Sequence, residues 1–124
     1  MSSYADAVTA YTESHSRGDV DAVVALFADD AVVYDPVDQP PYEGIEAVRG
    51  FFGGTHEMVD SLTLTLTGPI RTTKHEAAFP MMATSVIGDL KMEIDIIDVM
   101  TFNEDGKITQ MRAYWNMSDA RTLA

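Results

Sequence analysis

The sequence has no cysteine, few basic residues and no long apolar run. The lack of cysteine excludes disulfides and thiolate metal ligands and fits the reducing cytoplasm, where we expect the protein. Only 8 Lys and Arg oppose 20 Asp and Glu, and this disfavours nucleic acid and anionic membranes as partners because both require basic patches. No segment approaches the length of a membrane span, and the first residues lack the basic and apolar regions of a signal peptide.

The remaining composition is that of a globular protein. With 124 residues and 46% hydrophobic content, residues 1–124 are expected to form a single domain with a substantial core. Helical spacing of apolar residues predicts three helices in the first half of the chain. The first is capped by Ser2 or Ser3 and ends at Gly18, and the second runs from a cap at Asp19 to Phe27.

The third helix is expected to begin near Ile45 and to stop at the Gly53-Gly54 pair. The segments around it are extended, with a short strand over residues 31–34 and a proline-rich loop over residues 36–44. Residues alternating between two faces then predict strands over 61–67, 76–87, 90–102 and 107–117, and Pro80 suggests an edge or a bulge. The predicted class is α+β, with three N-terminal helices packed on a curved, mainly antiparallel β-sheet.

The strand over residues 90–102 carries an unusual side chain. Its even positions are all large and apolar except Asp98, so a regular strand places this carboxyl group in the apolar interior. An isolated ion is costly there, and the group should be protonated or find a partner. A neutral carboxylic acid in a dry pocket can donate a hydrogen bond to developing negative charge. The alternative is a β-bulge near Ile96-Ile97 that turns Asp98 to the solvent.

Taken in order, several stretches resemble the bacterial ketosteroid isomerase family, also called steroid Δ-isomerases. They cover nearly the whole chain and comprise Tyr11 before Gly18-Asp19, Phe27–Pro36, Gln39–Gly44, Asp95–Phe102 and Met111–Trp115. The resemblance implies the cone-shaped fold of the nuclear transport factor 2-like superfamily, usually a homodimer, with a deep apolar pocket between the helices and the sheet. It also implies a cis peptide bond between Asp35 and Pro36.

The same resemblance implies a reaction and three catalytic residues. Asp35 would be the general base that moves a proton from one carbon to another, without any cofactor or metal ion. Tyr11 and a protonated Asp98 would form the oxyanion hole for the dienolate, and this family is itself a known example of a carboxylic acid kept neutral by an apolar site. Read without the resemblance, Asp35 could simply begin an Asp-Pro turn, and Tyr11 could be an ordinary core tyrosine.

Three positions depart from the family pattern. His15 shares a helix face with Tyr11, where the family usually has an apolar residue; an interaction with the helix dipole is the favoured interpretation, and contact with the ligand is the alternative. Some members carry tyrosines at the positions of Phe27 and Phe52, and their loss should weaken Tyr11 as a donor. The other histidines, His56 and His75, are placed in turns and carry no functional signal.

The apolar faces of the predicted elements give the expected substrate contacts, which suit a flat, steroid-like molecule. They are Leu26, Phe51, Phe79, Met81, Ile94, Ile96, Met111 and Trp115. The main hypothesis is therefore a steroid Δ5-3-ketosteroid isomerase. Two others remain open: a polyketide cyclase or epoxide hydrolase on the same fold, and a non-catalytic module that binds hydrophobic small molecules or dimerises.

Overall fold

The computed structural model describes residues 3–123. Its helices are α1 (Tyr4–Ser16), α2 (Val20–Val24), α3 (Ile45–Glu57) and the 3-10 helix η1 (Met117–Asp119). Its strands are β1 (Phe27–Tyr34), β2 (Tyr42–Glu43), β3 (Ser61–Leu66), β4 (Arg71–Thr72), β5 (Glu76–Ile87), β6 (Leu90–Phe102), β7 (Ile108–Tyr114) and β8 (Arg121–Leu123). Within the described residues, no helix is both long enough and apolar enough to cross a membrane.

The helix caps follow the predicted signals. Ser3 caps α1: its hydroxyl accepts from the backbone N–H of Asp6, whose carboxylate accepts from the N–H of Ser3 in return. The alternative cap, Ser2, lies outside the described residues. The first helix ends before Gly18, which takes a φ of 73° that favours glycine. Asp19 then caps α2 by accepting from the N–H of Ala22.

Two predicted helix boundaries are wrong. Helix α2 ends at Val24, and Phe27 instead opens β1, because the chain there pairs with Ile108 of β7 and the strand ladder overrides the helical pattern. Helix α3 passes through Gly53 and Gly54 and ends at Glu57. Glycine in a helix costs roughly 1 kcal/mol relative to alanine, which the packing of the buried Phe52 face can offset.

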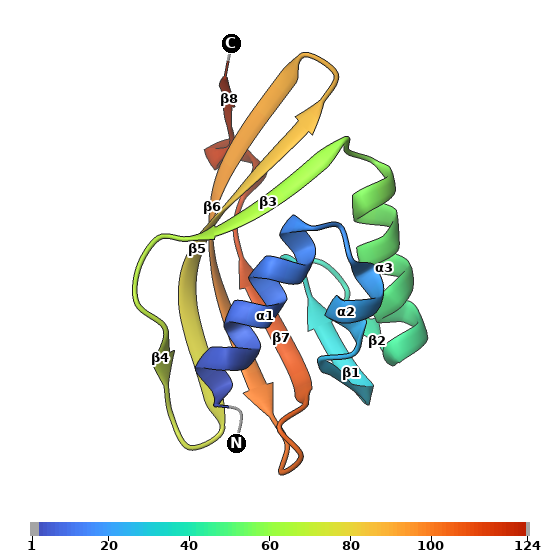
Figure 1. Cartoon of the computed structure of the whole chain (residues 1–124), viewed down its shortest axis with the longest axis vertical. Coiled ribbons are helices and arrows are strands. Elements are labelled where there is room, and N and C mark those ends of the chain that lie inside the picture. Colours follow the sequence, from blue (N-terminus) through green and yellow to red (C-terminus); the bar gives the residue numbers. More distant parts are fainter. Residues whose placement is uncertain (1–2, 124) are drawn as a thin grey trace.

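The strands form one curved, unclosed sheet with the helices packed against it (Figure 1). Its order is β2-β1-β7-β6-β5-β3, with β4 added to β5 and β8 added to β6. All pairs are antiparallel except β1 with β7, which are parallel. This α+β architecture confirms the predicted fold class. The parallel pair brings the end of β1 beside the end of β7, and two of the site residues lie there.

The pairing of β5 with β6 fixes the orientation of Asp98. The register runs without interruption from Leu90 opposite Ile87 to Thr101 opposite Glu76, so the alternative of a bulge near Ile96-Ile97 is wrong. Asp98 is fully buried, and its neighbour Ile97 is 53% exposed on the other face of the sheet. The period-two alternation therefore delivers the carboxyl group to the interior.

Pro80 is accommodated in a strand with neighbours on both sides. It pairs with Ile97 of β6, and its carbonyl accepts from the N–H of Thr67, just beyond the last residue of β3. The proline nitrogen lies on the same side of β5 as that carbonyl, so the missing N–H falls at the point where β3 ends. Gly68 packs closely against the Pro80 ring, since a Cβ on Gly68 would lie 2.9 Å from Cγ of Pro80. The sheet edge that was predicted at Pro80 is therefore limited to the point where β3 ends.

Candidate active site

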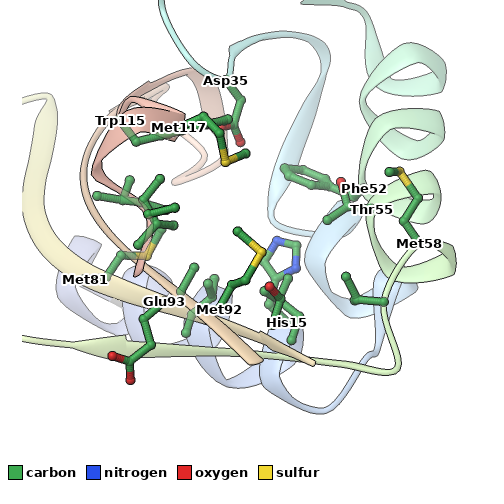
Figure 2. A pocket seen from close by; sticks show the side chains of 18 of the residues that line it. His15, Asp35, Phe52, Thr55, Met58, Met81, Met92, Glu93, Trp115 and Met117 are labelled. Carbon is green, nitrogen blue, oxygen red and sulfur yellow. The ribbon is translucent and has the colours of Figure 1, made fainter. Parts of the chain in front are cut away.

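A cavity of about 450 Å³ lies between the helices and the sheet. Helix α1 contributes Tyr11 and His15, α3 contributes Phe51 and Phe52, and the strands supply most of the apolar wall. Asp35 and His15 enter from different sides in Figure 2. A volume of this size is typical of pockets for small molecules, and the mainly apolar lining with a few polar groups suits a hydrophobic ligand.

Asp35 follows directly after β1 and reaches the cavity beside Trp115, which follows β7. The Trp115 Nε1–H donates to Oδ1 of Asp35 over 2.6 Å. Burial raises the pKa of Asp35 to about 6, against the lowering effect of the bond from Trp115. Asp35 is still mainly ionised at pH 7, and its peptide bond to Pro36 is cis, as the resemblance implied.

Asp98 lies in a drier place. It is fully buried, and neither carboxyl oxygen has a hydrogen-bond partner. Burial, and then the charge of Asp35, raise the pKa of Asp98 well above its ordinary value, which favours the neutral form of the group. Asp98 is not itself part of the cavity lining, although it influences the ionisation of a residue that is.

That residue is Tyr11, which is 2% exposed and lies on the cavity side of α1. Burial, followed by the charges of Asp98 and Asp35, raises the pKa of its hydroxyl well above 10. Tyr11 therefore remains a proton donor across the working pH range. Its ring is held edge-on by Phe27 and Phe52, with ring centroids 6.3 and 6.2 Å away. These rings pack against Tyr11 without offering it a hydroxyl, which is consistent with the missing tyrosine network.

His15 has a different environment from the one favoured by the sequence. It is 3% exposed, and its Nδ1 lies 2.9 Å from Nε2 of His56, which belongs to α3 and not to a turn. Burial, and then the nearby His56, lower the pKa of His15 to about 3. The ring is therefore neutral at pH 7, and an interaction between a cationic His15 and the helix dipole does not occur. His15 lines the cavity together with Tyr11.

The predicted substrate contacts divide into two groups. Five of them line the cavity: Phe51, Met81, Ile94, Ile96 and Trp115. The other three, Leu26, Phe79 and Met111, do not line it. Phe79 and Met111 are 1% and 0% exposed within the core, and Leu26 packs against that core from the connection between α2 and β1. Alternation identifies the inner face of a strand, but it does not tell which part of that face the core side chains already fill.

The sequence analysis also missed part of the lining. The missed residues include Thr55, Met58, Leu62, Leu64, Ser85, Met92, Glu93 and Met117. Glu93 lines the cavity, and its carboxylate lies 3.7 Å from the guanidinium of Arg121 in β8. Met58 follows the last residue of α3 and Met117 begins η1, and the positions of both depend on the tertiary fold. Within residues 3–123, no cluster of three His, Asp or Glu could hold a metal ion.

Comparisons with known proteins agree with this geometry. The SnoaL-like domain family matches residues 8–111. A steroid Delta-isomerase from Nocardioides simplex is 36% identical over 113 residues, which cover 91% of this chain and 89% of the relative.

Two solved structures have the same fold. One is the epoxide hydrolase/cyclase-like enzyme SalBIII, studied for pyran ring formation in the polyether salinomycin, with a TM-score of 0.87 and 27% identity over 97% of this chain and 95% of that one. The other is RV0760c from Mycobacterium tuberculosis, with a TM-score of 0.84 and 27% identity over 94% and 93% of the two chains.

Proposed function

The chain belongs to the SnoaL-like domain family within the nuclear transport factor 2-like superfamily, and from this premise we propose that it is a steroid Δ5-3-ketosteroid isomerase. The observation that carries the proposal is the pair of unlike carboxyl groups around Tyr11. Asp35, with a pKa of about 6, is mainly ionised at pH 7 at the cavity wall, and the raised pKa of the buried Asp98 favours its neutral form. Proton transfer through an enolate requires a base and a hydrogen-bond donor, and the two aspartates can supply one each.

The proposed reaction has two proton transfers. The Asp35 carboxylate takes a proton from the carbon between the ketone and the carbon–carbon double bond, and the electrons move to the ketone oxygen to give a dienolate. Tyr11 and Asp98 each donate a hydrogen bond to that oxygen, in a site from which water is excluded. The protonated Asp35 then returns the proton two carbons further on, and the conjugated enone forms. Atoms and charge balance without any cofactor.

Each step has support in the geometry. Trp115 fixes the Asp35 carboxylate through Oδ1, which leaves Oδ2 free to accept the proton. Tyr11 lines the cavity from α1. Asp98 has two oxygens without partners, a costly arrangement that a ligand oxygen would relieve. Because Asp98 lies outside the lining, the ligand oxygen must displace the side chains that cover it.

A second candidate is ring formation by opening an epoxide, as the printed description of SalBIII suggests for that enzyme. Its support is the same pair of carboxyl groups, since a neutral acid can protonate an epoxide oxygen while a carboxylate activates the attacking hydroxyl. The steroid Delta-isomerase is the more similar in sequence, at 36% against 27% identity. We therefore place isomerisation first.

We also infer a homodimer formed through the outer face of the sheet, in a cytoplasmic protein. Ile97 and Tyr114 are cross-strand neighbours on that face, and they are 53% and 45% exposed. Large apolar side chains exposed side by side on a sheet are typical of an interface. An Ile97→Asp substitution should shift the protein to a monomer in analytical ultracentrifugation, and an unchanged sedimentation coefficient would contradict the inference.

The test of the activity is the appearance of the conjugated enone from 5-androstene-3,17-dione, followed by ultraviolet absorbance. Asp35→Asn removes the base and should lower turnover by about 10²–10⁴-fold. Asp38→Asn, an exposed aspartate in the loop after β1, is the matched control and should keep the rate. If the steroid binds without reacting, isomerisation of this substrate is wrong. Cyclisation of a hydroxy-epoxide that depends on both Asp35 and Asp98 would then favour the second candidate.

A further inference from the structure

His15 and His56 form a buried polar pair that the proposed reaction does not use. His15 lies one helical turn after Tyr11 on α1, and His56 lies in the last turn of α3. Their rings share a hydrogen bond of 2.9 Å between Nδ1 of His15 and Nε2 of His56. The ring of His15 also stands edge-on to Tyr11 and Phe52, at centroid distances of 4.6 and 4.9 Å. Its orientation is therefore fixed from three sides.

The other nitrogen of the His15 ring has no partner. Nε2 is buried and makes no hydrogen bond within the protein, although His15 belongs to the lining of the cavity. An unsatisfied buried nitrogen lowers stability, and such a group is expected to serve a purpose or to meet a water or ligand. Figure 2 shows the ring directed into the cavity that holds Asp35 and Trp115. The place where this nitrogen could find a partner is the ligand site.

We propose that His15 is a ligand-binding residue whose Nε2 forms a hydrogen bond with a hydroxyl group of the substrate. The proposal rests on the isomerase function, because it takes the substrate's ketone oxygen to lie at Tyr11. The ring centroids of Tyr11 and His15 are 4.6 Å apart, so the hydroxyl belongs on the same edge of the ring system as the ketone.

A hydroxyl fits this position better than a ketone or a charged group. The hydrogen between the two histidines can belong to either ring, and this leaves Nε2 of His15 as an acceptor in one case and as a donor in the other. A hydroxyl satisfies both cases, whereas a ketone satisfies only the donor. Since His15 is neutral at pH 7, it offers no charge to an anionic ligand. Met81 and Met92 line the same cavity, and flexible methionines can move aside for the group.

The experiment measures the affinities of 4-androstene-3,17-dione and a set of its derivatives, each with one added hydroxyl at a different ring position. One derivative should bind about 2- to 12-fold more tightly than the parent, as a single net hydrogen bond allows. His15→Leu should abolish this preference. His75→Leu removes an exposed histidine outside the cavity and should keep it.

A second measurement needs no substitution. In protein labelled with 15N-histidine, the Nε2 signal of His15 should move further with the preferred derivative than with the parent steroid. The inference is wrong if the Nε2 signal moves equally with the preferred derivative and the parent steroid. It is also wrong if His15→Leu still binds the hydroxyl derivative more tightly than the parent steroid. A lower kcat in His15→Leu with the hydroxyl preference intact also overturns it, because His15 would then act only by positioning Tyr11.

These results separate the inference from the proposed function. Isomerisation without any hydroxyl preference rejects the role of His15 alone. A hydroxyl preference without isomerisation rejects the reaction and keeps the binding site. If none of the steroids binds, both are rejected.

Discussion

Asp35 and Asp98 are the same residue type in two unlike regions of one interior. Asp35 lies where β1 ends and receives a hydrogen bond of 2.6 Å from the indole of Trp115. Asp98 lies within the long strand β6, fully buried and without a partner. Burial raises the pKa of both, but the donor at Asp35 keeps its pKa at about 6, and no donor does so for Asp98. The hydrogen bond at Asp35, together with the burial of Asp98 and the negative charge beside it, therefore separates a base from an acid.

Burial alone does not assign a role to a carboxyl group. A bond from an N–H group stabilises the ionised form and keeps a buried aspartate available as a base near neutral pH. Without such a bond, and with another negative charge nearby, the proton stays and the group becomes a donor. The difference can be tested by changing either region by itself.

Among the changes that leave Asp35 in place, removing the donor at position 98 should have the largest effect. Asp98→Leu should lower kcat on 5-androstene-3,17-dione by about 10²–10³-fold, the usual loss for one oxyanion donor. Asp98→Asn keeps an N–H donor of similar shape and should lose less. Circular dichroism should confirm that both variants fold. Equal losses in the two variants would contradict the assignment of Asp98 as a hydrogen-bond donor.

The next effect is on stability. Because the folded protein holds Asp98 with a raised pKa, it keeps a proton that the unfolded chain releases above pH 3.8. The stability due to this group is complete below that pH and is lost as the pH rises. Relative to Asp98→Asn, the parent protein should lose unfolding free energy as the pH rises above about 4, by about 1.4 kcal/mol per pH unit until Asp98 ionises in the folded protein.

Urea unfolding at several pH values measures this difference. Asp105 is an exposed aspartate in the turn after β6, and Asp105→Asn is the matched control. Its difference in unfolding free energy from the parent should not change with pH. A flat difference for Asp98→Asn as well would mean that Asp98 is ionised in the folded protein.

Much of the contrast between the two aspartates could be predicted from the sequence. The alternation along residues 90–102 placed Asp98 in the interior, and the unbroken pairing of β5 with β6 confirms this orientation. The α+β class and the capping of α1 and α2 were also predicted correctly, because these features depend on local spacing and on residues close in sequence. The ends of α2 and α3 were not, because tertiary packing outweighs local glycine and apolar signals there.

The partners of the site residues could not be predicted. Trp115 meets Asp35 only because β1 and β7 pair in parallel, and nothing near either residue indicates that pairing. His56 meets His15 because α3 continues past two glycines, and the sequence argued against this. The burial of Phe79 and Met111 in the core, away from the cavity, likewise depends on how the assembled elements pack.

A smaller effect should follow from removing the donor at Asp35. Without the indole N–H, Trp115→Phe should raise the pKa of Asp35, and the acid limb of the kcat/KM profile should move from about pH 6 to higher pH by about one unit. The rate then falls at pH 6 and recovers at alkaline pH, since only the ionised carboxylate accepts the proton. Tyr114→Phe changes an exposed neighbour on the outer face and should leave the limb in place. An unmoved limb in Trp115→Phe would mean that this bond does not hold the pKa of Asp35 down.

The smallest effect concerns Tyr11, the donor between the two aspartates. Its ring is 6.2 Å from that of Phe52, centroid to centroid, so Phe52→Tyr brings a hydroxyl near the Tyr11 oxygen. A hydrogen bond donated to that oxygen makes Tyr11 a stronger donor to the dienolate, and kcat should rise by a few-fold, about 2- to 5-fold. Thermal unfolding should accompany the kinetics, because a buried hydroxyl without a partner lowers stability. A variant that folds normally and gains no rate would indicate that Tyr11 needs no such network, and that Asp98 supplies the larger part of the stabilisation of the oxyanion.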